Sequence, residues 1–244
     1  MPLDEELAEV YRQWQEVSAQ LVRSREALEA WQDHRYAFAH RLGDALIRPL
    51  LTRSPPVTHV IYGVYSVGVG LAYIGQTSDP LRRLRDLPIG ESHHLANTIA
   101  PEMWDRVIVL TWPDLLGRTT ADERAVLDEA IKKPKERGLP LEHGLQVTLQ
   151  PPMNLRTRGA NGQWRPRPLT RSRSIGATVA PLIPILTSRA REAWSDLAAA
   201  AAHPLDPTIA TTEFGHCIFP RNIGSAEWGE SGPRVRTRAE RETS

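Results

Sequence analysis

The chain has 244 residues, enough for one well-buried domain with attachments or for two small ones. Its 30 basic and 29 acidic residues nearly cancel, so net charge alone indicates neither a nucleic-acid nor a membrane partner. A single cysteine, Cys217, excludes an internal disulfide, and no apolar run approaches the roughly 18 residues that span a bilayer. With an acidic start that lacks the pattern of a signal peptide, we expect a cytoplasmic protein without a membrane partner.

The basic side chains are almost all arginine, since only Lys132, Lys133 and Lys135 are lysine. The planar guanidinium of arginine binds phosphates and guanine edges through two hydrogen bonds at once. This composition suits a nucleic-acid partner, although a GC-rich genome produces the same bias.

Residues 1–52 are expected to form one long helix. Between residues 4 and 45 there is no proline and only one glycine, and apolar side chains recur at alternating steps of three and four. That spacing is a heptad seam, with Ser24 and Arg35 as polar interruptions. We favour a helix that packs on its own chain or wraps DNA over one that pairs with a second copy in a homodimer. Pro49, and then Ser54-Pro55-Pro56, are expected to end the helix.

Residues 57–155 are expected to form a compact α+β core, with a small, three-stranded, mostly antiparallel sheet flanked by helices. β-Branched and aromatic side chains predict two strands, and Gly68 and Gly70 supply the reversal of a hairpin between them. The expected elements are strands at 57–65 and 71–75, a helix from Asp79-Pro80, a strand within 105–112, a helix from about 119 to 133, and a short strand at 145–149.

The remaining third of the chain divides into two parts. Residues 156–224 are expected to hold an arginine-rich irregular segment and then a helix at about 187–202, with loop-like sequence beyond Pro204. Residues 225–244 have the glycine, charge and small-residue content of a disordered tail.

Two short motifs resemble the paired signatures of the GIY-YIG nuclease superfamily. The first is Gly63-Val64-Tyr65, and the second begins at Tyr73-Ile74-Gly75 and reaches Arg83, eight residues after its glycine. The second motif is the more specific because it combines the tripeptide with the arginine spacing. The resemblance implies a strand that leads through a threonine turn to a helix carrying the arginine.

The resemblance also implies a glutamate on a later helix and an asparagine near the end of the core. Asn154 follows Pro151-Pro152 and fits the asparagine. Glu123 and Glu129 lie on the same expected helix, and Glu123 is favoured because the apolar residues after it suggest a face buried against the sheet. Residues 132–144 form an expected insertion before the asparagine, in a position to contact DNA.

The sequence departs from the family pattern in two further places. Only seven residues separate Tyr65 from Tyr73, which is shorter than usual and requires a clipped hairpin. Leu87 stands where the family often has a histidine, and His93 or His94 is the candidate replacement.

Phosphodiester hydrolysis requires a deprotonated water, neutralised phosphoryl charge and a stabilised leaving alkoxide. Side chains on adjacent antiparallel strands lie about 5 Å apart, so Tyr65 and Tyr73 are expected to converge, with Tyr65 as general base or water-orienting group. Arg83 is the expected phosphate clamp, Glu123 the ligand of Mg²⁺ or Mn²⁺, and Asn154 a brace.

Basic side chains near these residues are the candidate DNA contacts. The densest basic stretch follows Asn154 directly and is interleaved with Trp164, an arrangement that also fits a solvated loop. The candidate contacts are Arg82, Arg85, His93, His94, Arg156, Arg158 and Arg165.

The function expected from these residues is a metal-dependent DNA endonuclease, of restriction or defence type. One alternative is a structure-specific repair nuclease, because residues 77–83 are similar to the same turn in Holliday-junction-type GIY-YIG subunits. An alternative of another class is a non-catalytic module that binds DNA or dimerises through its N-terminal helix.

Overall fold

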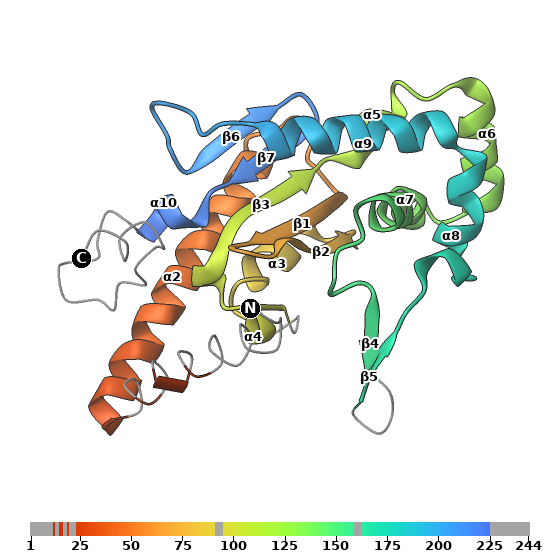
Figure 1. Ribbon diagram of the computed structural model, residues 1–244. Coiled ribbons are helices and arrows are strands. Elements are labelled where there is room, and N and C mark those ends of the chain that lie inside the picture. The colour runs from red at the N-terminus through yellow and green to blue at the C-terminus, as the bar shows by residue number, and fades with distance from the viewer. Residues whose placement is uncertain are drawn as a thin grey trace.

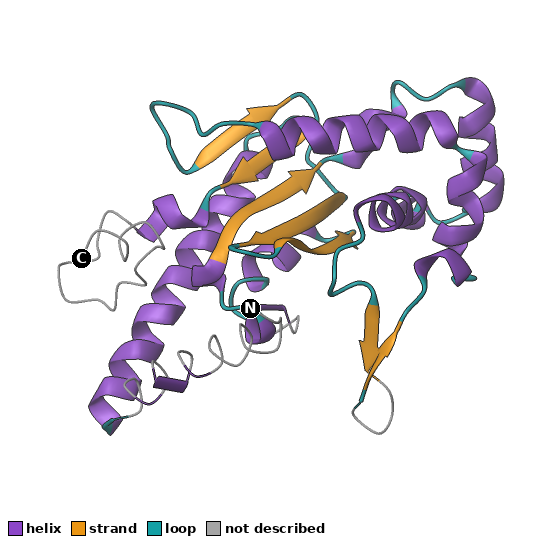
Figure 2. Cartoon of the chain, viewed as in Figure 1, coloured by secondary structure: helices purple, strands orange, loops and turns teal. Residues whose placement is uncertain are grey.

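The computed structural model describes residues 12, 15, 16, 19, 23–90, 95–158 and 163–224, and it shows an α+β fold (Figures 1 and 2). Five antiparallel strands form one sheet in the order β2-β1-β3-β7-β6. These strands are β1 (Val60–Ser66), β2 (Gly70–Thr77), β3 (Trp104–Leu110), β6 (Ile209–Thr212) and β7 (Gly215–Ile218).

The prediction of three strands was therefore wrong. The chain beyond Pro204, expected as loop, forms the β6–β7 hairpin, and β7 pairs with β3 over residues 215–218. Strands of four residues are too short for an alternating pattern to be distinguished from loop sequence. The sheet thus continues from the predicted core into the predicted C-terminal extension.

Two layers of helices enclose the sheet. Helices α2, α3 and α4 contribute to one hydrophobic core, and α5, α6, α7, α8 and α9 contribute to the other, on the opposite face. The helices are α2 (Arg25–Leu51), α3 (Pro80–Asp86), α4 (Leu95–Thr98), α5 (Trp112–Leu116), α6 (Ala121–Ala130), α7 (Leu139–Leu149), α8 (Ile175–Val179), α9 (Pro184–Ala199) and α10 (Pro220–Gly224). Single 3₁₀ turns are η1 (Pro101–Met103), η2 (Pro134–Glu136), η3 (Leu169–Arg171) and η4 (Ala180–Leu182). Among the described helices, none combines the length and apolar character that crossing a bilayer requires.

The second half of α2 packs on its own chain. Ser24 begins the helix by accepting a hydrogen bond from the backbone N–H of Ala27 at 3.1 Å, so the polar interruption in the heptad is an N-cap. The buried residues begin at Phe38, and the helix continues through Pro49 and ends at Leu51, before Ser54-Pro55-Pro56. The apolar seam positions before residue 23 lie outside the described residues, so the homodimer stays a prediction.

Strand alternation sends neighbouring side chains of β1 to different cores. Tyr62 and Val64 belong to the core under α2 and α3, whereas Ile61 and Tyr65 belong to the core under α7 and α9. Tyr73 on β2 pairs with Val64 and lies on the α3 side. This division decides which tyrosines meet.

Residues 145–149, predicted as a strand, form the second half of α7. The alternation that suggested a strand coincides with the four-residue spacing of Leu141 and Leu145, both fully buried. Gln150 ends the helix in the left-handed conformation, with φ 51°, immediately before Pro151. The helical assignment places Glu142 and Gln146 one turn apart, on a helix that packs against β2.

A second, two-stranded sheet projects from the body of the protein (Figure 1). Its strands are β4 (Arg156–Arg158) and β5 (Trp164–Pro166), which pair antiparallel with Thr157 opposite Arg165. This β4–β5 hairpin follows Asn154 directly in the chain, within the segment predicted to be irregular and rich in arginine.

Candidate active site

The hydroxyl groups of Tyr62 and Tyr73 meet above Gly75. Gly75 pairs with Tyr62 across β1 and β2, and the two tyrosine rings are 6.1 Å apart between centroids. A Cβ added to Gly75 would lie 2.8 Å from the Tyr73 hydroxyl and 2.9 Å from the Tyr62 hydroxyl. Only glycine therefore leaves room for both hydroxyls at this position.

The two tyrosines interact electrostatically. Burial, the largest effect on each, raises the pKa of Tyr62 well above its usual value and that of Tyr73 to about 12. The pair is thus a coupled unit.

Tyr65, predicted as the general base, lies on the other face of the sheet. Its hydroxyl accepts a hydrogen bond from Nε1 of Trp194 on α9 at 3.0 Å, and it pairs across the strands with Leu71 rather than with Tyr73. Tyr65 lies three positions after Tyr62, an odd offset that sends the two rings to opposite faces. The tyrosine that accompanies Tyr73 is therefore Tyr62.

Arg83 stands beside the tyrosine pair, as predicted. It is one turn into α3, which Asp79 caps by accepting from the backbone N–H of Arg82. The guanidinium of Arg83 lowers the pKa of both Tyr62 and Tyr73, although less than burial raises them. A threonine turn, with Thr77 accepting from the Asp79 backbone N–H at 3.0 Å, connects β2 to this helix.

The carboxylate at the site belongs to Glu142, in the first turn of α7. Burial raises the pKa of Glu142 to about 7, while Arg167 and a hydrogen bond from Gln146 act in the opposite direction. The negative charge of Glu142 in turn raises the pKa of Tyr62 and Tyr73. Glu142 is thus electrostatically coupled to both tyrosines.

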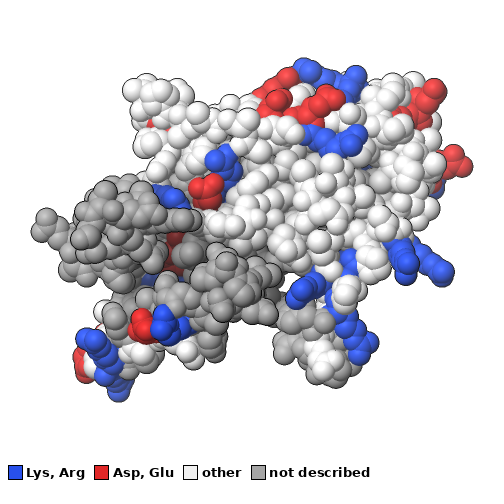
Figure 3. Space-filling model, in the orientation of Figure 1, with Lys and Arg blue, Asp and Glu red and all other residues white. Residues whose placement is uncertain are grey.

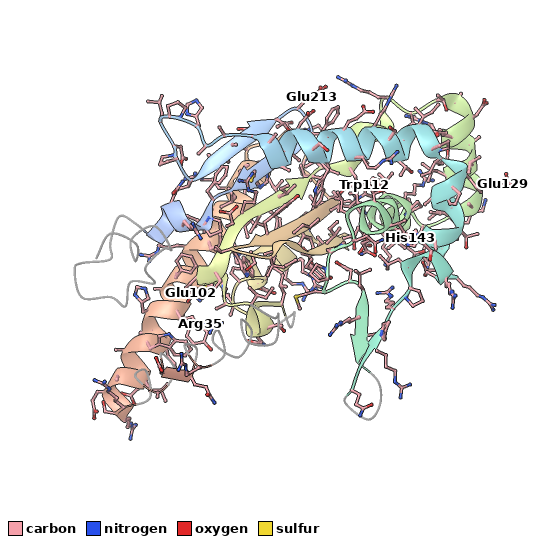
Figure 4. All side chains as sticks on the ribbon, viewed as in Figure 1. Arg35, Glu102, Trp112, Glu129, His143 and Glu213 are labelled. Atoms are coloured by element: carbon pink, nitrogen blue, oxygen red, sulfur yellow. The ribbon has the colours of Figure 1, made fainter. Side chains whose placement is uncertain are left out.

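Glu123, predicted as the metal ligand, instead caps α9. Its two carboxylate oxygens accept hydrogen bonds from the backbone N–H groups of Ile185 at 2.7 Å and Leu186 at 3.0 Å. The residue before α9, Ile183, makes no side-chain cap, so Glu123 supplies the acceptors and a negative charge for that helix N-terminus. Glu129, the alternative, is exposed on α6 at the outer edge of the molecule (Figure 4).

Asn154 braces the strand that carries Tyr73 and Gly75. Its Oδ1 accepts from the backbone N–H of Ile74 at 2.8 Å, and its Nδ2 donates to the Ile74 carbonyl at 2.9 Å. These bonds satisfy the outward-facing backbone of Ile74 on β2, the edge strand of the sheet. In the structure, Asn154 thus braces the backbone of β2 by hydrogen bonding.

The donor set suits a divalent cation with one protein carboxylate. Oε1 of Glu142 accepts from Nε2 of Gln146 at 2.9 Å, and Oε2 receives no hydrogen bond from any residue that the structure describes. Mg²⁺ binds through one or two carboxylates while keeping several waters and a substrate phosphate oxygen. Within the described ranges, no three His, Cys, Asp or Glu side chains are grouped to hold a metal. The residues fit Mg²⁺ or Mn²⁺ on Glu142, in place of the predicted Glu123.

The predicted DNA contacts fall into three groups. Arg82 and Arg85 on α3 are ion-paired, with Asp79 at 3.1 Å and Asp44 at 3.6 Å. Arg156 and Arg165 are exposed on the β4–β5 hairpin, with the backbone of Arg158 beside them. The side chain of Arg158, like His93 and His94, lies outside the description. Leu87, at the expected histidine position, is fully buried.

Sequence reasoning missed three residues of the site. Strand alternation could predict Tyr62 as the partner of Tyr73 only if the register of the hairpin was known. A β-bulge at Val64/Tyr65 shifts that register. Glu142 was hidden by the assignment of a strand to the end of α7. Arg167 belonged to a segment taken as irregular, and its position depends on contacts distant in the sequence.

The site gathers two tyrosine hydroxyls, a carboxylate and two guanidinium groups at the edge strand β2. Hydroxyls and cations of this kind suit the binding of a phosphate group and the orientation of a water molecule beside it. A comparison of the chain with protein-family models, with curated proteins and with solved structures found no match.

Proposed function

We propose that this protein hydrolyses phosphodiester bonds in DNA with the help of a divalent metal, at a GIY-YIG-type site formed by Tyr62, Tyr73, Arg83 and Glu142. The observation that carries the proposal is the meeting of the two tyrosine hydroxyls above Gly75, within electrostatic reach of Arg83 and Glu142. If this were only a structural edge of the sheet, nothing would require a glycine at position 75, beneath two convergent hydroxyls.

The tyrosine pair orients the attacking water and receives its proton. The water oxygen forms a bond to phosphorus, and the ester bond breaks with its electron pair on the departing oxygen, which then takes up a proton. Arg83 neutralises the phosphoryl oxygens on which negative charge develops. The high pKa of the buried pair means that cations beside it must favour its ionised form, and Arg83 is one such cation.

Glu142 is the residue that would hold Mg²⁺ or Mn²⁺. The ion, when bound, supplies Lewis acidity and positive charge beside the phosphate. Gln146 orients the carboxylate by donating to Oε1 and also donates to the Ile74 carbonyl at 3.3 Å. It therefore links Glu142 to the strand that carries Tyr73.

The distribution of arginine supports DNA as the substrate. Basic side chains gather around the β4–β5 hairpin at the lower edge of the molecule (Figure 3). Neutralisation of several phosphates by such a surface is the main source of affinity for DNA. Between Glu142 and Glu192 the sequence has no acidic residue and eight arginines, Arg156, Arg158, Arg165, Arg167, Arg171, Arg173, Arg189 and Arg191.

Incubation of supercoiled plasmid with the protein tests the proposal. We expect nicked and linear products with Mg²⁺ or Mn²⁺, and none with EDTA. Arg83→Ala should lower the cleavage rate by about 100-fold or more while DNA binding in a gel shift is retained. Arg82→Ala on the same helix removes an exposed, ion-paired guanidinium and is the matched control. Intact plasmid with wild-type protein and either metal would refute the proposal.

The DNA class is a further choice within the same chemistry. We favour a restriction or defence endonuclease, because basic segments surround the proposed site. Discrete bands from an unmethylated plasmid would support that choice, whereas selective cutting of four-way-junction oligonucleotides would support a repair nuclease. The two substrates at matched concentration distinguish these functions directly.

A further inference from the structure

Arg167 is anchored to the site through the backbone. Its N–H donates to the carbonyl of Leu155 at 2.6 Å, immediately after the strand β5. Leu155 follows Asn154, which is hydrogen bonded to both backbone groups of Ile74, the residue between Tyr73 and Gly75. A short chain of hydrogen bonds therefore fixes Arg167 relative to the tyrosine strand.

The guanidinium of Arg167 acts on three groups of the site. Its positive charge lowers the pKa of Glu142, of Tyr73 and of His143, the residue beside Glu142 on α7 (Figure 4). Tyr73 thus lies within reach of two guanidinium groups, from Arg83 on α3 and from Arg167 after β5. The two cations come from different elements and share one tyrosine.

Arg167 is not neutralised by an acidic partner. It is exposed and forms no ion pair with any residue in the described part of the chain, not even with the nearby Glu142. Some other surface arginines are ion-paired, as Arg48 is with Asp206 at 2.7 Å. Its five N–H donors are therefore directed to a ligand from outside the protein or to solvent.

We infer that Arg167 is a second phosphate-binding residue of the active site, which holds the reacting phosphate of DNA together with Arg83. The inference rests on the proposed function and adds a residue that sequence reasoning did not select. Two guanidinium groups on one phosphate neutralise the charge that spreads over its oxygens as the bond to water forms. The β4–β5 hairpin and the residue that follows it thereby contribute to the reaction as well as to the affinity for DNA.

Arg165 offers a matched comparison on the same hairpin. It lies two residues earlier, opposite Thr157, and is also exposed. No group of the site has a pKa that responds to Arg165, in contrast to Arg167. We expect Arg165 to contact the DNA backbone away from the reacting phosphate.

Single-turnover cleavage at saturating DNA, together with DNA affinity measured with Ca²⁺ in place of Mg²⁺, tests the inference. Arg167→Ala should lower the cleavage rate by about 100-fold and weaken affinity by less than about 5-fold. Arg165→Ala should mainly weaken affinity and reduce the salt dependence of binding by about one phosphate contact. Added guanidinium should restore part of the rate to Arg167→Ala, an effect that a structural role does not produce.

Arg48→Ala, which removes an ion-paired arginine remote from β2, should change neither rate nor affinity. If wild-type protein cleaves DNA and Arg167→Ala cleaves at the same saturated rate, the role of Arg167 is refuted while the proposed function stands. If guanidinium restores nothing and the melting temperature has fallen, Arg167 is structural. If wild-type protein cleaves no DNA with either metal, both are refuted.

Discussion

Asn154 completes the outer edge of β2 by bonding to both backbone groups of Ile74, its Oδ1 accepting at 2.8 Å and its Nδ2 donating at 2.9 Å. A side-chain amide here replaces the neighbouring strand that an edge strand lacks. The bonds fix the backbone of the candidate site, so we expect Asn154 to affect the proposed reaction through position rather than by contact with substrate.

Replacement of Asn154 by alanine should lower the free energy of unfolding by about 2–4 kcal/mol, because the Ile74 N–H loses its partner and the Ile74 carbonyl keeps only the bond from Gln146. Urea denaturation measures this directly. Asn97→Ala is the control, since Asn97 is exposed and makes one bond, to the Gly90 carbonyl at 3.3 Å. It should cost less than about 1 kcal/mol. Equal losses for the two variants would contradict the bracing role.

Gly75→Ala should damage activity more than stability. The added Cβ displaces the ends of the Tyr62 and Tyr73 rings, which can move, but their hydroxyls no longer meet. We expect a cleavage rate lowered by about 10-fold to 100-fold and a loss of about 1 kcal/mol in stability.

Gly63→Ala is the matched variant on the other face of the sheet. Its Cβ would lie 2.5 Å from the buried ring of Trp194 on α9, so stability should fall more than with Gly75→Ala. The cleavage rate per folded molecule should fall less. A fully active Gly75→Ala protein would argue against the tyrosine pair.

The stability of the protein should depend on pH through His216. This residue is buried, and its Nε2 donates to the carbonyl of Leu46 at 2.9 Å. Burial lowers the pKa of His216 from 6.5 to about 4. The unfolded chain therefore binds a proton that the folded protein does not, and the contribution of His216 to stability falls between pH 6.5 and 4, by about 3 kcal/mol.

Glu142 acts in the opposite sense, because its raised pKa lets the folded protein take up a proton first as the pH falls. The difference between wild type and His216→Asn isolates the histidine. The unfolding free energy of wild type relative to that of the variant, measured in urea at pH 7.5, 6 and 5, should decrease as the pH falls. A constant difference across this range would contradict the burial of a neutral imidazole.

Tyr73, Gly75 and Arg83 were selected through the resemblance of one motif, and all three belong to one strand-turn-helix unit. The spacing of local elements is fixed by the chain itself. The start of helix α3 at Asp79 and Pro80 could be predicted for the same reason. Asn154 was also found, although its bonds to Ile74 span 80 positions in sequence.

Glu142 and Tyr62 required tertiary information. Leu145 to Leu149 fits a strand and a helix equally, and only the packing of α7 on β2 resolves the choice in favour of the helix. Which tyrosine of β1 shares a face with Tyr73 depends on the register shift between Val64 and Tyr65. The β6–β7 hairpin is stabilised because β7 pairs with β3, a strand about 100 residues earlier in the chain.

The most direct test of the account compares Glu142→Gln with Glu123→Gln in the plasmid cleavage assay, with each rate divided by the folded fraction from circular dichroism. We predict that Glu142→Gln lowers cleavage by about 100-fold or more without loss of stability, because it removes the proposed metal ligand and a carboxylate that is costly to bury. Glu123→Gln should lose about 1–2 kcal/mol of stability at the start of α9 and keep its activity. Full cleavage by Glu142→Gln, or an inactive but folded Glu123→Gln, would contradict the site described.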